Sequence, residues 1–213
     1  MMVLIQGSEA DKHSQLIDAM HRLRAKVFGD RLGWAVTVVD GRERDKFDDL
    51  NPLYALSLDA ADRVVGTFRL LQTTGPTMLG EVFSACLPPG LVIRSPIIWE
   101  STRFCVDTEL ARERGERGLS EVTAELLSSL LEIGLYAGLS HIVTVIDVRM
   151  ERILRRAGCP IERLAEPVKI GDVPTLAILM ECSDETVAHL HQRNGLSEGF
   201  IRPETIMRLH QAA

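Results

Sequence analysis

Two charged residues stand in a stretch that otherwise favours a β-strand, "IIWESTRFCVD" at positions 97 to 107. A carboxylate there is suited to accept a proton, and a guanidinium is suited to form bidentate pairs with carboxylates or phosphates. Because side chains of a regular strand alternate between faces, Glu100 and Arg103 should point to opposite sides of a sheet. We therefore expect either an unimportant sheet edge or a β-bulge or splay near residues 101 to 104 that turns both charges towards one cleft.

Two arginines occupy positions that the apolar pattern marks as buried. Arg24 lies at the edge of the apolar stripe of a helix expected over residues 11 to 28, and Arg69 lies on an expected strand over residues 63 to 71. A buried guanidinium without a partner is costly, so carboxylates must be near. The candidates are Glu43, Asp45, Asp48 and Glu100. The pattern predicts that these two arginines, Arg103 and several of the acids converge on one polar cluster inside an apolar domain; a purely structural ion-pair network, or a solvated acidic loop, is the alternative.

The elements that must position these residues follow from periodicity and turn signals. The expected helices span residues 11–28, 78–83, 119–138, 148–157 and 183–193, and the expected strands span 53–59, 63–71, 97–107, 141–147 and 173–181. Ser120 and Ser183 are candidate N-caps, and Gly138 and Gly158 are candidate helix ends. The acidic stretch at 40–52 reads as irregular. This order of elements predicts an α/β fold with a mixed sheet and helices on both faces.

Composition narrows the class of protein. The 213 residues carry 46% hydrophobic and 25% charged side chains and no linker-like stretch, which predicts a single domain over residues 1–213. The N-terminus lacks an export signal and the apolar runs are strand-sized, so we expect a cytoplasmic protein without membrane association. The net charge of −6 argues against nucleic acid as a partner. The four cysteines and six histidines show no metal-ligand spacing, so no metal site is expected.

Ten widely separated positions together carry a resemblance to a known family. They are Arg24, Phe28, Trp34, Glu43, Asp45, Asp48, Arg69, Phe83, Glu100 and Arg103. Their order and spacing resemble those of the acyl-homoserine lactone synthases, the LuxI-type autoinducer synthases of bacteria. The match covers about the first half of the chain without large gaps and the second half more loosely.

The resemblance implies a fold and a reaction. The fold is that of GCN5-related (GNAT) acyltransferases, a three-layer αβα sandwich with a V-shaped cleft between central strands. In the reaction, an acyl thioester on acyl carrier protein or coenzyme A acylates the α-amine of S-adenosylmethionine, which then closes to a lactone and expels methylthioadenosine. S-adenosylmethionine is thus a substrate, and no prosthetic group is implied.

The resemblance also assigns roles in the chemistry. The amine must lose a proton before it attacks, which makes Glu100 the first choice and Glu43 the second choice for general base. Backbone N–H groups beside Arg103 and Phe104 are the expected oxyanion donors.

Other residues are implied to bind S-adenosylmethionine. Phe28 and Trp34 would pack on the adenine and the sulfonium, with plain core packing as the alternative. Asp45 would bind the amine or hydroxyls, and Phe83 belongs to the same binding set. Arg24, Arg69, Arg103 and Asp48 would brace the N-terminal lid.

The acyl donor is expected to use the second half of the chain. The strand 141–147 and the helix 119–138 would line an acyl pocket that includes Thr102, Thr144 and Ile146. Chain length, the oxidation state at the 3-position, the choice of donor and the oligomeric state stay open. The helix 148–157 should bury Ile153, Leu154 and Ala157 and expose a stripe of Arg149, Arg152 and Arg156. That stripe is a candidate docking site for acidic acyl carrier protein, or a merely solvated helix face.

The sequence leaves two alternative functions open. One is an N-acyltransferase of the same fold that acts on another amine, and the other is a non-catalytic binding domain. The first would cradle a coenzyme A pyrophosphate on an Arg/Gln-x-x-Gly-x-Gly/Ala turn, but Arg117 stands here where the turn requires a small residue. No glycine-rich Rossmann loop is present either.

Overall fold

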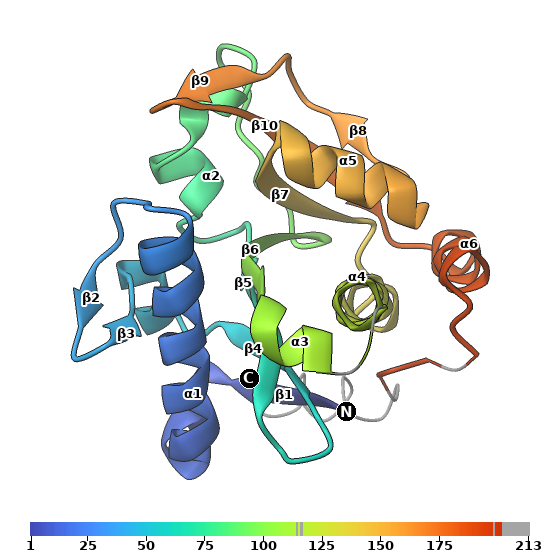
Figure 1. Ribbon diagram of the computed structural model, residues 1–213. Coiled ribbons are helices and arrows are strands. Elements are labelled where there is room, and N and C mark those ends of the chain that lie inside the picture. The colour runs from blue at the N-terminus through green and yellow to red at the C-terminus, as the bar shows by residue number, and fades with distance from the viewer. Residues whose placement is uncertain (114, 116, 198, 202–213) are drawn as a thin grey trace. The chain divides into compact units, whose positions relative to one another are not determined.

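The computed structural model describes residues 1–113, 115, 117–197 and 199–201 (Figure 1). The chain divides into two compact units. The first unit comprises Met1–Leu70 and Arg103–Leu126, and the second comprises Leu71–Thr102 and Leu127–Ala213. Strand β6 (Ile98–Val106) and helix α4 (Gly118–Tyr136) run through the boundary between these stretches. The single domain over 1–213 stays a prediction.

Three antiparallel strands organise the first unit. β1 (Met2–Gln6) pairs with β4 (Leu53–Leu58), and β4 pairs with β5 (Val64–Gln72). Every residue of β4 is buried, so this strand lacks the alternation of a half-exposed one. β1 is not among the elements predicted from the sequence, because its five residues, MVLIQ, show no alternation of apolar and polar side chains.

The first helix is shorter and less regular than its apolar stripe predicts. The α-helical part, α1, spans Ser14–Arg24; a 3-10 helix (Gly7–His13) precedes it and a π-helical turn (Ala25–Arg31) follows. The expected inward stripe is confirmed, because Met20, Leu23 and Val27 are buried. A π-turn winds the backbone more widely than an α-helix, and such turns often occur at functional sites.

The acidic stretch is ordered rather than irregular. Strands β2 (Val38–Val39) and β3 (Arg42–Glu43) form a small hairpin, and a 3-10 helix (Lys46–Asp49) follows it. Asp45 accepts a hydrogen bond from the backbone of Phe47, while the Asp48 side chain accepts one from the backbone N–H of Asp45 at 2.9 Å. Such a capping box satisfies the first donors of a short helix reciprocally. Helix α3 (Thr108–Glu113) completes the unit.

The second unit carries parallel and antiparallel pairs. β6 pairs in parallel with β7 (His141–Asp147), and β7 pairs antiparallel with β10 (Val173–Glu181). The short strands β8 (Glu162–Arg163) and β9 (Val168–Ile170) both pair with β10. The mixed character of the predicted sheet is confirmed.

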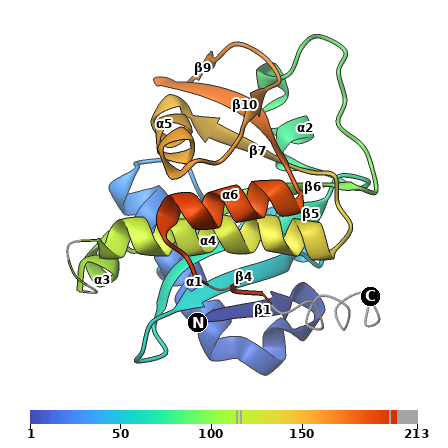
Figure 2. The ribbon, with the colours of Figure 1, turned by 90° about the vertical axis from the view of Figure 1, so that its right-hand side faces the viewer.

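The helices of the second unit are α2 (Met78–Glu81), α5 (Val148–Ala157) and α6 (Asp184–Asn194), with a 3-10 turn at Ser84–Cys86. Ser183 caps α6, and Gly158 ends α5 with a positive φ, both as predicted. α6 lies beside α4, as Figure 2 shows. Within the described residues, no helix has both the length and the apolar character needed to cross a membrane.

Two helix predictions are wrong. Ser120 is not the N-cap of α4, because that helix already begins at Gly118 and the Ser120 hydroxyl donates to the carbonyl oxygen of Arg117. Ile153 does not face inward, because 47% of it is exposed. On α5 the buried side chains are those of Glu151 and Leu154. The true inward face is therefore narrower than the periodicity indicates.

Candidate active site

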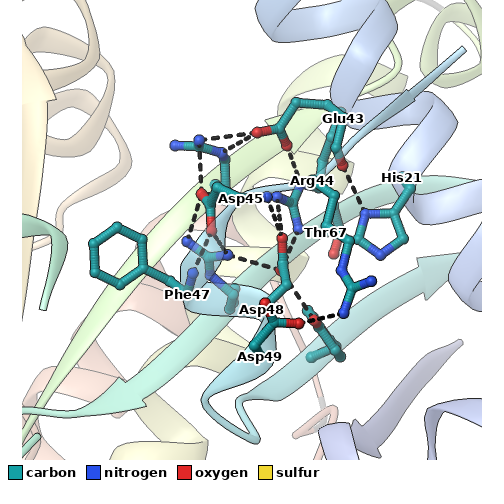
Figure 3. Close-up of polar contacts among 12 residues, drawn as sticks. His21, Glu43, Arg44, Asp45, Phe47, Asp48, Asp49 and Thr67 are labelled. Atoms are coloured by element: carbon teal, nitrogen blue, oxygen red, sulfur yellow. Dashed lines mark hydrogen bonds and ion pairs between the residues drawn. The ribbon is translucent and has the colours of Figure 1, made fainter. Parts of the chain in front are cut away.

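An ionic network of three arginines and three carboxylates occupies the interior of the first unit, and Figure 3 shows its acidic members and neighbouring residues. Arg24, which is 1% exposed, anchors it from the end of α1. Its Nε donates to Glu43, and its two terminal nitrogens donate to the two carboxylate oxygens of Asp48 at 2.8 and 2.9 Å. This fork is the bidentate geometry that arginine forms with carboxylates.

Arg69 reaches the same carboxylates from β5. One terminal nitrogen donates to Asp45 at 2.6 Å and to Asp48 at 2.7 Å, and the other donates to Asp45 at 3.1 Å. Its guanidinium also lies over the Phe47 ring, 5.7 Å from the centroid. The strand thus places a fully buried cation against two acids of the 3-10 segment.

Arg103 closes the network from β6. Its Nε and one terminal nitrogen donate to the same oxygen of Glu43 at 3.1 and 2.9 Å, and the terminal nitrogen lies 2.8 Å from Asp45. The convergence of three arginines on these acids is confirmed. Three positive and three negative charges then balance in a buried place, which offsets much of the cost of desolvating them.

The strand is distorted where the sequence predicts it. Arg103 has φ +56°, a left-handed conformation that residues other than glycine rarely adopt. A backbone in that region cannot continue a regular β-ladder, and non-glycine outliers of this kind gather at functional sites. That Glu100 and Arg103 face one cleft stays a prediction.

The arginines fix the ionisation of the acids. Burial alone would raise the pKa of Asp48, but the hydrogen bond from Arg24 and the charges of Arg24 and Arg69 hold that pKa far below its ordinary value. Against the same effect of burial, Arg69 and Arg103 lower the pKa of Asp45. Both carboxylates therefore remain ionised in the working range of pH, and neither is suited to accept a proton.

The two candidate bases have different surroundings. Glu43 is completely buried, and each of its oxygens accepts from a guanidinium, Arg24 on one side and Arg103 on the other. Glu100 is also completely buried, but its oxygens accept from the backbone N–H groups of Met78 at 2.9 Å and Leu79 at 2.6 Å. These donors belong to the first residues of α2, so the carboxylate is held in one orientation.

Two aromatic pairs adjoin the network in the first unit. The rings of Phe28 and Trp34 stack with centroids 5.1 Å apart, and the guanidinium of Arg103 lies 5.4 Å from the centroid of Phe28. Phe28 is buried, whereas 42% of Trp34 is exposed. Phe104 stacks on Phe68 with centroids 6.2 Å apart. An exposed tryptophan on a buried aromatic support offers a flat surface for a ligand.

The remaining predicted residues lie in the second unit. Phe83 packs against a hydrophobic cluster that contains Leu79. Thr144 is buried on β7 opposite Ser101 of β6, and Ile146 is the next residue on the same face. Thr102 is half-buried on β6. The stripe of Arg149, Arg152 and Arg156 is exposed, as predicted. In the described part of the chain, no group of three or more His, Cys, Asp or Glu side chains is placed to hold a metal.

Two residues that sequence reasoning missed support the network. The Nδ1 of His21 lies 2.7 Å from the carbonyl oxygen of Glu43, and the hydroxyl of Tyr54 donates to Asp48 at 2.9 Å. Both side chains are buried. The sequence could have indicated them, because His21 and Tyr54 lie in segments with a buried apolar face. A buried imidazole or phenol hydroxyl needs a hydrogen-bond partner.

Comparison with known proteins identifies the family. The family model described as autoinducer synthase matches residues 8–190. A "Probable acyl-homoserine-lactone synthase" of Sinorhizobium fredii is 43% identical over 187 residues, 88% of this chain and 90% of that protein. An acyl-homoserine-lactone synthase of Rhizobium radiobacter is 43% identical over 178 residues, 83% and 84% of the two chains.

Solved structures show the same relationship. The AHL synthase LasI matches with a TM-score of 0.78 and 35% identity over 90% of this chain and 95% of that one. BjaI, a CoA-dependent acyl-homoserine lactone synthase, matches with a TM-score of 0.82 and 26% sequence identity, and the match covers 99% of each chain. A putative N-acetyltransferase from Lactobacillus plantarum, 18% identical over 85% and 99% with a TM-score of 0.53, shares the fold. The predicted mixed α/β, GNAT-like fold is confirmed. This chain belongs to the autoinducer synthase family.

Proposed function

We propose that this protein is an acyl-homoserine-lactone synthase. It transfers an acyl group from a thioester to the α-amine of S-adenosylmethionine, and the lactone then closes with release of methylthioadenosine. The observation that carries the proposal is the family match over residues 8–190, in a chain whose buried network unites the predicted arginines and acids. Structures of relatives are described with MTA, and one of BjaI with SAM and isopentyl-CoA.

Glu100 is the general base in this proposal. The backbone N–H groups of Met78 and Leu79 hold its carboxylate in one orientation, and a carboxylate fixed in this way is suited to accept a proton from the amine directly or through water. Glu43, in contrast, joins two guanidinium groups. Both of its oxygens are thus engaged in holding arginines of the network. We therefore propose that Glu43 holds Arg24 and Arg103 in place and does not accept the proton.

S-adenosylmethionine binds beside the network. Its sulfonium and adenine fit the stacked pair of Phe28 and Trp34, with a cation–π attraction of roughly 0.5 to 2 kcal/mol. Asp45 receives the amine or a hydroxyl, because its side chain is 18% exposed whereas those of Glu43 and Asp48 are 0% and 1% exposed. Arg24, Asp48 and Arg69 brace the segment that carries Asp45, and the family resemblance adds Phe83, a residue of the second unit, to the same binding set.

The acylation step needs donors for the oxyanion that forms on the thioester carbonyl. The backbone at Arg103 has a φ of +56°, which departs from the geometry of a regular strand. We assign the oxyanion contact to the backbone N–H groups beside Arg103 and Phe104. The acyl chain then lies against Thr102, Thr144 and Ile146, two of which share one face of β7.

Acyl carrier protein is the proposed donor, although relatives such as BjaI and MesI are described as CoA-dependent. The exposed stripe of Arg149, Arg152 and Arg156 suits an acidic carrier, in a protein whose net charge is −6. The neighbouring Arg155 and Arg163 are already paired with Glu151. The sequence predicts a cytoplasmic protein, and we place the enzyme there.

One incubation separates this function from its rivals. Purified protein is supplied with S-adenosylmethionine and a panel of acyl-carrier thioesters, and free thiol and methylthioadenosine are measured together. The synthase reaction releases both in equal amounts. Thiol that appears only when another amine is added, without methylthioadenosine, would indicate an N-acyltransferase for that amine, and neither product with any carrier or coenzyme A thioester would indicate a binding domain.

A further inference from the structure

We propose that His21 and Tyr54 are positioning residues, which hold the acidic segment of residues 43–48 in the conformation that binds S-adenosylmethionine. The proposal rests on the proposed function for its choice of ligand. Neither residue is among the ten positions that carry the family resemblance, and neither belongs to the ionic network itself. They form a second layer behind it, one from α1 and one from β4.

Tyr54 acts on Asp48. Its ring is 3% exposed, and its hydroxyl donates at 2.9 Å to the same Asp48 oxygen that accepts from Arg24 at 2.8 Å and from Arg69 at 2.7 Å. Three donors from three elements therefore meet at one oxygen. The two guanidinium groups are long and rotatable, whereas the tyrosine hydroxyl is fixed by a ring packed inside a fully buried strand. It defines where that oxygen sits.

His21 acts on the backbone of Glu43. A carbonyl oxygen only accepts, so the Nδ1 at 2.7 Å from it must carry the proton. Arg24, three residues further along α1, binds the side chain of the same Glu43. One helix thus holds both the backbone and the carboxylate of that residue. The rings of His21 and Tyr54 meet edge to face, with centroids 6.4 Å apart, which joins the two anchors.

The geometry leads from these anchors to the ligand. Arg69 donates with one nitrogen to both Asp45 and Asp48, and one nitrogen of Arg103 lies within 3 Å of both Glu43 and Asp45. A shift of Glu43 or Asp48 therefore moves an arginine that holds Asp45. Because both anchors are uncharged donors, they fix the segment without disturbing the balance of three positive and three negative charges. Loss of either anchor should therefore weaken the binding of S-adenosylmethionine and leave the binding of the acyl donor unchanged.

Three substitutions test this inference. Tyr54→Phe removes only the hydroxyl. His21→Asn keeps an amide donor at the position of Nδ1, whereas His21→Gln moves the donor one bond further away. Thr67→Val is the matched control, because it deletes a buried hydroxyl on β5 that donates to the carbonyl oxygen of Ala55 at 2.8 Å and touches none of the acids.

The expected result is a split between the two Michaelis constants. Tyr54→Phe and His21→Gln raise the KM for S-adenosylmethionine by roughly three- to tenfold, the range of one lost hydrogen bond, and leave the KM for the acyl donor unchanged. His21→Asn and Thr67→Val leave both constants near the wild-type values. Equal increases for both substrates, or equal losses in the Asn and Gln variants, would overturn the proposal.

A second measurement does not depend on turnover. Amide hydrogen exchange of residues 43–48 in the unliganded protein should be faster in Tyr54→Phe and His21→Gln than in Thr67→Val, at equal global stability. Unchanged exchange in this segment would refute the positioning role. If the wild-type protein released no methylthioadenosine with any donor, the proposed function would fail, while this exchange measurement would still decide the positioning proposal.

Discussion

Replacing Asp48 by Asn is the sharpest test of the buried ionic network, because the two side chains have nearly the same shape. The Asp48 carboxylate accepts two hydrogen bonds from Arg24, one from Arg69, one from Tyr54 and one from the backbone of Asp45. The amide would keep the volume but remove a negative charge. Three buried arginines would then face two carboxylates.

The expected loss follows from that imbalance. Removing one partner of a buried ion pair costs about 3 to 5 kcal/mol, because the remaining charge stays buried without compensation. Asp49→Asn is the matched control, since its pair with Arg44 lies at the surface with side chains 65% and 61% exposed, and such pairs contribute at most about 1 kcal/mol. Urea unfolding followed by circular dichroism measures both free energies of unfolding.

A double variant separates charge balance from packing. Asp48→Asn combined with Arg69→Met leaves two arginines and two carboxylates, so its loss of stability should be smaller than the sum of the two single losses. If Asp48→Asn and Asp49→Asn shifted the urea midpoint equally, the buried charges would not be energetically coupled. This result would refute the energetic coupling of the three arginines and three carboxylates.

Three further predictions concern pH, packing and the donor. Burial and the nearby Arg24 lower the pKa of His21, so below its unfolded pKa of about 6.5 the unfolded chain binds a proton that the folded chain does not. Stability should therefore fall as the pH drops from about 6.5, and His21→Asn should lose this component in pH-dependent urea titrations. Gly66→Ala would place a Cβ 2.6 Å from Leu126 Cδ1 and should cost about 1 to 3 kcal/mol in thermal unfolding, whereas Gly75→Ala meets nothing within 4 Å and should cost little. Neutralising two of the three exposed α5 arginines should raise the KM for acyl carrier protein and spare that for S-adenosylmethionine in steady-state assays; equal effects on both would refute the docking site.

The charges that break a pattern were the most predictable part of the site. Arg24 and Arg69 stand in apolar periodicities, and a guanidinium that is forced inward must find carboxylates, so the pairing with the acidic segment follows from the sequence. The distortion at Arg103 was predictable for the same reason, since a regular strand cannot serve two charges three residues apart. These inferences need only local geometry and the cost of burying charge.

What could not be predicted depends on tertiary contacts. Glu100 accepts hydrogen bonds from backbone N–H groups of α2. Every residue except proline has such a donor, so the residue types in α2 do not indicate the contact. Tyr54 lies in a strand that is buried throughout, so no alternation marks its face. Ile153 fits the helical stripe but is exposed, because burial depends on which neighbours cover the helix and not on its period.

The division of labour between the two buried glutamates is the central claim, and the steady-state release of methylthioadenosine by Glu100→Gln and Glu43→Gln tests it most directly. We predict that Glu100→Gln lowers kcat by about 10²-fold or more with little change in the KM for S-adenosylmethionine, because a general base contributes roughly 10² to 10⁴ to the rate. Glu43→Gln should mainly raise that KM. The reverse pattern, with the loss of kcat in Glu43→Gln and an active Glu100→Gln, would contradict the account.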